Sequence, residues 1–136
     1  MRKAFADTQF DLAILSPDDA DHRRAKEASA RFHGDVVTTH WVLMEVGDAF
    51  CAPRNRPRFL ALLNLLGADP NAAIVPADAA WFERGVDLYR RRPDKEWSLT
   101  DCISFVVMEE HGIREALTAD EHFEQAGFIA LLRDTP

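Results

Sequence analysis

Four acidic residues of this chain lie beside apolar segments and not in charged runs, namely Asp7, Glu45, Asp101 and Asp120. If the fold brings them together, each close pair of carboxylates is repelled by about 4 kcal/mol at an effective dielectric near 20. Mg²⁺ or Mn²⁺ relieves this repulsion, because hard cations take oxygen ligands and keep several waters. A water activated in such a site can attack a phosphorus atom. The four residues therefore predict a metal centre that cleaves phosphodiesters.

Each of these acids also has an ordinary structural explanation. Asp101 follows Ser98 at the spacing of a capping box, and Asp120 has the position of an acid at a helix start. Glu45 lies at the margin of an apolar stripe, where it can be solvated. Asp7 has the weakest explanation of this kind, because a carboxylate at the end of a buried strand needs partners or a metal. The four residues together are more specific than any one of them.

Short apolar runs alternate with longer amphipathic runs along the chain. Strands are predicted at 3–7, 35–38, 72–75, 115–118 and 127–131. Helices are predicted at 9–15, 18–33, 39–51, 57–66, 77–91, 98–111 and 120–125. The segment 103–108 has strand-like residues, but the preceding capping-box pattern and the following Gly112 predict a helix there. Strands that alternate with helices indicate a parallel sheet covered on both faces.

This pattern predicts where the acids lie. Ligands of doubly wound sheets bind at the carboxyl ends of the strands, where the strand order reverses. Asp7 ends the first predicted strand and Asp120 follows the fourth, so the two meet if those strands are neighbours. Asp101 lies in the first turn of the helix before the fourth strand, and Glu45 in the second turn of the helix after the second strand. The core stripe of the latter helix is predicted to consist of Val42, Val46, Ala49 and Phe50.

Composition narrows the class of protein. The 136 residues predict a single domain over 1–136, and 47% hydrophobic with 29% charged residues is ordinary for a soluble globular protein. No apolar run approaches the roughly 20 residues of a membrane span, and Asp7 and Asp11 interrupt any signal-peptide core, so we expect a cytoplasmic protein. The net charge of −7 argues against a protein that coats nucleic acid through a broad basic surface. The same charge is consistent with attraction of a basic partner protein. Cys51 and Cys102 are predicted to be buried free thiols.

Four motifs occur in an order and at separations that resemble a known family. They are Phe5-Ala6-Asp7-Thr8, Val42-Leu43-Met44-Glu45-Val46, Ser98-Leu99-Thr100-Asp101-Cys102 and Leu117-Thr118-Ala119-Asp120-Glu121-His122-Phe123. On these motifs the chain resembles PIN-domain ribonucleases, in particular the VapC-type toxins of toxin–antitoxin pairs, over essentially its whole length. The resemblance implies a three-layer α/β/α sandwich with a five-stranded parallel sheet in the order 3-2-1-4-5. That order would place the first and fourth strands side by side.

The resemblance also implies a site and an activity. The family's catalytic, metal-binding acids match Asp7, Glu45, Asp101 and Asp120. Small hydroxyl residues that line the family's pocket match Thr8 and Ser98. The implied activity is Mg²⁺- or Mn²⁺-dependent cleavage of RNA by a homodimer that a cognate antitoxin inhibits. The residue after Thr8 is often Ser or Asn in the family, and Gln9 replaces it here.

Two further expectations concern surfaces. With only three lysines, RNA contacts must depend on arginine, and the residues predicted to make them are Arg54, Arg56 and Arg58. The run Arg90 to Arg92 is interpreted as the tail of a surface helix. Self-association is expected through apolar side chains, with Trp41, Trp81 and Phe82 as candidates.

Other functions remain open at this point. A non-catalytic binding module of the same fold could dock an arginine of a basic partner, and a stand-alone PIN nuclease could act in RNA processing or on structured DNA. The complete set of four acids favours a nuclease over a binding module. The short length of the chain favours a toxin over a stand-alone nuclease. A receiver domain is disfavoured because no aspartate ends the predicted strand 72–75.

Overall fold

The structure is a computed structural model that describes residues 2–133. Its strands are β1 (Lys3–Ala6), β2 (Asp35–Thr39), β3 (Ala72–Val75), β4 (Glu115–Leu117) and β5 (Ile129–Ala130). Its helices are α1 (Thr8–Leu15), α2 (His22–Arg31), α3 (His40–Ala49), α4 (Arg56–Ala68), α5 (Ala79–Arg91), α6 (Leu99–Glu110) and α7 (Glu121–Gln125).

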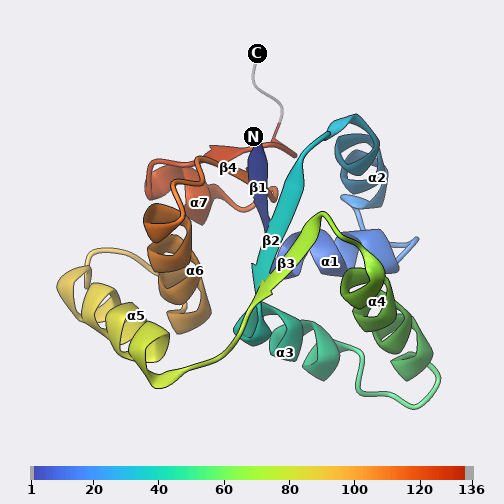
Figure 1. Ribbon diagram of the computed structural model, residues 1–136, viewed down its shortest axis with the longest axis horizontal. Helices are drawn as coiled ribbons and strands as arrows, with labels where there is room; N and C mark the ends of the chain where they lie inside the picture. The colour runs from blue at the N-terminus through green and yellow to red at the C-terminus, as the bar shows by residue number, and fades with distance from the viewer. Residues whose placement is uncertain (1, 134–136) are drawn as a thin grey trace.

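The strands form one parallel sheet in the order β3-β2-β1-β4-β5. Helices α1, α2 and α4 lie on one side of this sheet and α5, α6 and α7 on the other, while α3 lies below the carboxyl ends of the strands (Figure 1). The predicted three-layer α/β/α fold and its strand order are therefore confirmed. The first and fourth strands are neighbours, as the predicted site requires.

The central strand shows why this sheet forms. Ala4, Phe5 and Ala6 are all buried, which is typical of a parallel strand that is covered on both faces. Successive side chains of a strand point to opposite faces. Phe5 accordingly belongs to the larger core cluster, which includes residues of α3 and α6, while Ala4 and Ala6 belong to a smaller cluster with residues of α1 and α2.

Several predicted boundaries differ by a few residues. The first strand ends at Ala6, because Asp7 caps α1 and does not continue the ladder. The second helix is confined to α2, since the chain turns at Ser16 to Asp19 before it. The last strand is limited to Ile129–Ala130. The segment 103–108 is helical, as predicted.

Two predictions about burial are wrong. Ala49 was predicted to belong to the core stripe of α3, but it is exposed, because the last turn of this helix extends past the core. Leu43 is buried instead, and Phe50 is buried just after the helix ends. Cys51 is exposed because it lies in the connection from α3 to α4. Cys102, in contrast, is buried on α6 as predicted, and both thiols are free.

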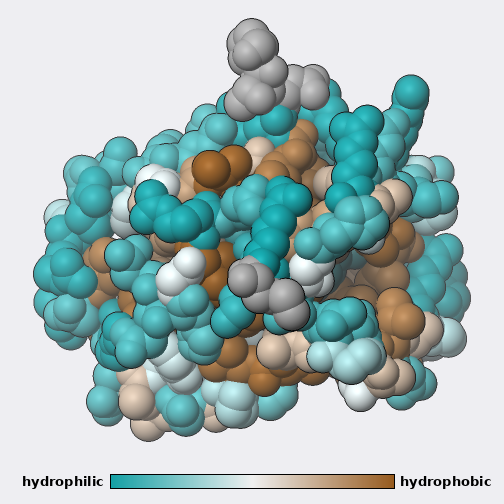
Figure 2. All heavy atoms as spheres, turned by 45° about the horizontal axis from the view of Figure 1, so that its top comes forward, coloured by the Kyte–Doolittle hydropathy of each residue, from teal (hydrophilic) through white to brown (hydrophobic). Residues whose placement is uncertain are grey.

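Figure 2 shows the end of the molecule at which β1 begins, opposite the carboxyl ends of the strands. Hydrophilic side chains cover most of this end, with hydrophobic ones visible in the hollows between them. Within residues 2–133, no helix has the length and apolar character that a membrane crossing requires.

Candidate active site

An acidic pocket of about 350 Å³ opens at the carboxyl ends of the strands. Its carboxylates belong to Asp7, Asp19, Glu45, Glu96, Asp101 and Asp120. The predicted hydroxyl residues Thr8 and Ser98 line it as well. Among the described residues, no lysine or arginine lines this pocket. Six carboxylates without a lysine or arginine beside them make an environment that attracts a cation.

Asp7 is the most deeply placed of these acids, with 5% of its surface exposed. It caps α1, since its Oδ1 accepts a hydrogen bond from the Phe10 amide at 3.0 Å, and its Oδ2 accepts one from the Thr118 hydroxyl at 2.7 Å. Burial raises the pKa of Asp7 to about 7, and the charges of Asp120 and Asp101 add to the rise, while the two hydrogen bonds oppose it. A nearby cation would favour the ionised carboxylate.

Asp120 is positioned by the end of β4. Leu117 pairs with Ala6, so Thr118 follows β4 beside the end of β1. The Thr118 hydroxyl accepts a hydrogen bond from the Asp120 amide at 2.9 Å. Asp120 in turn caps α7, because its Oδ1 accepts from the His122 amide at 2.9 Å. A short chain of polar contacts therefore fixes this acid relative to the central strand.

Asp101 is positioned by the start of α6. The Ser98 hydroxyl accepts from the Asp101 amide at 2.9 Å, and Asp101 Oδ2 accepts from the Ser98 amide at 3.1 Å, so the predicted capping box is present. Burial raises the pKa of the Asp101 carboxyl, against the opposing effects of the Ser98 amide and His122. The structural and chemical roles of Asp101 coexist, because a carboxylate can accept several hydrogen bonds.

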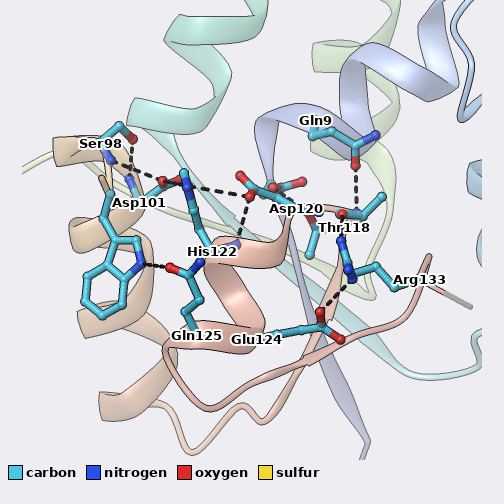
Figure 3. Close-up of polar contacts among 12 residues, drawn as sticks. Gln9, Ser98, Asp101, Thr118, Asp120, His122, Glu124, Gln125 and Arg133 are labelled. Carbon is cyan, nitrogen blue, oxygen red and sulfur yellow. Dashed lines mark hydrogen bonds and ion pairs between the residues drawn. The ribbon is translucent and has the colours of Figure 1, made fainter. Parts of the chain in front are cut away.

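His122 joins two of these acids into a cluster with the geometry of a metal site (Figure 3). One ligand atom each from Asp101, Asp120 and His122 lies within 4.8 Å of the others. His122 Nδ1 is 3.2 Å from Asp101 Oδ2 and 3.5 Å from Asp120 Oδ1. Carboxylate oxygens suit a hard divalent cation such as Mg²⁺ or Mn²⁺. An imidazole nitrogen is a ligand for first-row transition metals, so His122 suits Mn²⁺ better than Mg²⁺. The residues present therefore fit the predicted metal.

Residues 4–129 of the chain match the family model of the PIN domain. The chain belongs to the PIN-domain family. It is 31% identical over 128 residues to the 23S rRNA-specific endonuclease VapC20 of Mycobacterium tuberculosis, a match that covers 92% of this chain and 95% of that protein. The predicted resemblance to VapC-type toxins is thereby confirmed.

Solved structures with the same fold support this family assignment. The crystal structure of Mycobacterium tuberculosis VapC20, described as a Sarcin-Ricin loop cleaving toxin, superposes with a TM-score of 0.84 at 27% identity, covering 93% of this chain and 96% of that one. FitAcB from Neisseria gonorrhoeae superposes with a TM-score of 0.64 at 18% identity, covering 93% and 94%. The second similarity concerns the fold alone.

Glu45 of this PIN domain lines the pocket from α3 but lies outside the three-residue cluster. One of its oxygens, Oε1, accepts a hydrogen bond from the Thr8 hydroxyl at 2.5 Å. The structure thus brings all four predicted acids to one pocket. Among the described residues, the group of three whose ligand atoms all lie within 4.8 Å of one another consists of Asp101, Asp120 and His122.

Gln9, which departs from the family's usual small residue, has a defined place in this PIN domain. Its Oε1 accepts from the Ala119 amide at 2.8 Å, and its Nε2 donates to Asp21 Oδ2 at 2.9 Å. The longer side chain therefore connects α1 to the residue before Asp120 (Figure 3). It also connects α1 to Asp21, just before α2.

The predicted RNA-binding arginines lie away from the acidic pocket. Arg54 is in the connection from α3 to α4, and none of the three lines the pocket. Arg56 Nε donates to the Cys51 carbonyl at 2.7 Å, and Arg58 donates to the Leu15 carbonyl at 3.4 Å. Their contact with RNA stays a prediction.

Sequence reasoning missed three groups of this site. His122 lacked a zinc-type spacing, although its place two residues after Asp120 in a helix start was a usable signal. Asp19 and Glu96 also line the pocket, from loops whose position no local pattern reveals.

Proposed function

We propose that this protein is a Mg²⁺- or Mn²⁺-dependent endoribonuclease and the toxin of a toxin–antitoxin pair. One observation carries the proposal: the family's acids meet in a pocket that no described lysine or arginine lines, where Asp101, Asp120 and His122 offer ligand atoms within 4.8 Å of one another. A non-catalytic module that docks an arginine would need the same charge but not this ligand geometry.

Each residue of the pocket would have its own role in hydrolysis. Asp7, Asp101 and Asp120 would hold the ion together with His122, and Glu45, which lines the same pocket, would bind the ion or orient a water. When bound, the metal neutralises the carboxylates and supplies an activated water for attack on phosphorus. Glu45 Oε1 is held by Thr8, which would leave Oε2 as a proton acceptor in the pocket. The amide of Phe10 and the hydroxyl of Thr118 keep the Asp7 carboxylate in place.

We propose ribosomal RNA as the substrate to test, since the similar protein VapC20 is named as a 23S rRNA-specific endonuclease. A cognate antitoxin would bind the acidic pocket with a basic segment, and both proteins would act in the cytoplasm. Arg54, Arg56 and Arg58 remain candidates for contacts to the RNA backbone.

A homodimer also remains part of this proposal. Of the three aromatic candidates, Trp41 and Trp81 pack against the core, whereas Phe82 is 45% exposed. Met44 and Leu60 are more exposed, at 62% and 55%, and line a groove between α3 and α4. Size measurement by light scattering at micromolar concentration tests this part, and a monomer would contradict it.

The decisive experiment compares wild type with Asp7→Asn for Mn²⁺-dependent stability and for cleavage of ribosomal RNA. Mn²⁺ at 100 times its Kd adds about 2.7 kcal/mol to stability, which is on the order of 10 °C in Tm for a domain of this size. We expect this rise, and metal-dependent cleavage, in wild type only. Asp48→Asn is the matched control, because Asp48 is an exposed acid on α3 that does not line the acidic pocket.

Two outcomes would contradict the proposal. Cleavage by Asp7→Asn at the wild-type rate would show that Asp7 does not belong to the catalytic site. The absence of both a metal effect and cleavage in wild type would favour the binding module instead, and a basic partner peptide would be the next ligand to test.

A further inference from the structure

A second pocket adjoins the acidic one. It has a volume of about 740 Å³ and lies between the end of α5 and the start of α6. Glu96 lines both pockets, so the two pockets are neighbours at this residue. We call it the α5–α6 pocket. The side chains that matter below are Tyr89, Arg90, Arg92, Lys95, Glu96 and Trp97.

The charges of the two pockets are opposite. The α5–α6 pocket carries the cationic side chains of Arg90, Arg92 and Lys95 against the single carboxylate of Glu96. The acidic pocket holds six carboxylates, and no lysine or arginine of the described chain lines it. A protein that cleaves a polyanion must hold the phosphates next to the reacting one with cations. Within this chain, the α5–α6 pocket offers those cations directly beside the metal site.

The inner wall of the α5–α6 pocket is fixed relative to the site. The Arg92 guanidinium lies 5.0 Å from the centre of the Trp97 ring and is held by Asp94 through two contacts of 3.0 Å. Trp97 is buried, and its indole nitrogen donates to Gln125 at 3.1 Å (Figure 3). Trp97 also directly precedes Ser98, the residue that caps α6 and positions Asp101. Arg92 therefore has a positioning role, which leaves Arg90 and Lys95 to meet a ligand.

Arg90 and Tyr89 project from the last turns of α5. The Arg90 side chain is 72% exposed, and its ion pair with Asp87 is long, at 4.0 Å. Such an exposed pair contributes little, so the guanidinium can turn to a phosphate. Tyr89 is 54% exposed and lines the pocket. An aromatic face beside cationic side chains is the arrangement that binds unpaired nucleotides.

We propose that the α5–α6 pocket binds the stretch of single-stranded RNA next to the cleaved phosphodiester, with an unpaired base stacked on Tyr89 and backbone phosphates on Arg90 and Lys95. This inference rests on the proposed ribonuclease function and names the residues that hold its substrate. It assigns RNA contact to the end of α5, a segment that the sequence alone indicated to be only the tail of a surface helix.

Binding is measured separately from cleavage. A fluorescently labelled single-stranded RNA of about twelve nucleotides is titrated with protein in the Asp7→Asn background, and its anisotropy is recorded. Tyr89→Ala weakens binding about tenfold, in line with the loss of one stacked base, and Tyr89→Phe restores it. The double variant Arg90→Glu/Lys95→Glu weakens binding more strongly. It also reduces the salt dependence by about 0.7 in slope for each phosphate that the protein no longer neutralises.

Arg23→Glu is the matched control for charge. The Arg23 side chain is 90% exposed on α2, on the opposite side of the sheet from α5 (Figure 1). Paired with Arg31→Glu on the same helix, it gives the same change in net charge as the double variant. We expect this control to keep RNA affinity within about twofold. An unchanged Mn²⁺-dependent rise in Tm, measured with native Asp7, shows that each variant is folded with its metal site intact.

Single-turnover cleavage with native Asp7 provides the second measurement. Tyr89→Ala raises the enzyme concentration at half-saturation about tenfold, while the rate at saturation stays near wild type because no metal-binding residue has changed. If wild type cleaves RNA and the Tyr89 and Arg90/Lys95 variants bind like the α2 control, the inference is overturned and the proposed function stands. If wild type does not cleave RNA but these variants lose binding, the proposed function fails and the RNA-binding surface stands. If wild type neither cleaves nor binds RNA, both fail.

Discussion

The hydroxyl of Thr118 donates a hydrogen bond of 2.7 Å to the carboxylate of Asp7, although 111 positions separate the two residues in the chain. The same hydroxyl accepts from the Asp120 amide at 2.9 Å. One small side chain therefore connects the end of β1, the end of β4 and two acids of the pocket. This contact depends on the parallel pairing of the two strands, in which Ala6 lies opposite Leu117.

Replacement of Thr118 tests the importance of this contact. Thr118→Val keeps the shape of the buried side chain but leaves the Asp7 carboxylate and the Asp120 amide without their partner. We expect a loss of about 2 kcal/mol in the free energy of unfolding, together with at least tenfold slower RNA cleavage, because both acids lose their position. Thr118→Ser keeps the hydroxyl and should restore most of both. Equal cleavage by the valine and serine variants would show that the hydroxyl does not position the acids.

The metal-free protein should lose stability as the pH rises from about 4 to about 8. Burial raises the pKa of Asp7 to about 7 and that of Asp11 to about 8, whereas unfolded aspartate titrates near 3.9. The folded state therefore binds more protons than the unfolded state over this interval, so the free energy of unfolding falls with rising pH. In urea unfolding with a chelator present, we expect at least about 1 kcal/mol less stability at pH 8 than at pH 5.

Asp11→Asn should reduce that pH dependence. Asp11 is 5% exposed, and its Oδ2 is buried without a hydrogen-bond partner among the described residues. A neutral amide removes the cost of a buried charge, whereas Asp48→Asn at an exposed position of α3 should leave the pH dependence unchanged. An identical slope in wild type and Asp11→Asn would mean that Asp11 does not titrate in this range.

His122 should be a ligand and not merely a neighbour of the acids. Its Nδ1 lies 3.2 Å from Asp101, so His122→Ala removes a nitrogen ligand and leaves Asp101 and Asp120. We expect Mn²⁺ affinity, measured by calorimetry, to fall by at least about tenfold. His33→Ala provides the control, because His33 does not line the acidic pocket. If both variants bind Mn²⁺ like wild type, the ion is held by carboxylates alone.

The close packing of α5 on α6 depends on Gly85. A Cβ at this position would lie 2.3 Å from Ile103 Cγ1 and 3.2 Å from Ile103 Cα. Gly85→Ala should therefore push α5 away from α6 and cost about 1–3 kcal/mol in the free energy of unfolding. Gly67→Ala is the matched control, since nothing lies within 4 Å of its added Cβ and its helix should gain up to about 1 kcal/mol. Urea unfolding of both variants checks this, and equal stabilities would refute the packing argument.

Much of this protein was predictable from local patterns in the sequence. The alternation of short apolar and longer amphipathic runs indicated the parallel sheet. The spacing of Ser98 and Asp101 predicted a helix start that the structure contains. Asp7 at the end of a short, mostly apolar run indicated a functional carboxylate, because burial without a partner is costly. These signals are readable because helix-capping contacts and side-chain periodicity involve residues only a few positions apart.

The tertiary structure decided which side chains meet. Only packing brings His122 to Asp101, exposes Cys51, and makes Glu96 a shared wall of an acidic and a basic pocket. The same is true of Asp11, because the burial of its carboxyl on α1 depends on the segments that pack around it. Each of these facts depends on contacts between segments far apart in the chain. Which side chains meet, and how deeply they are buried, depends on the packing of the whole core, and no short stretch of sequence specifies it.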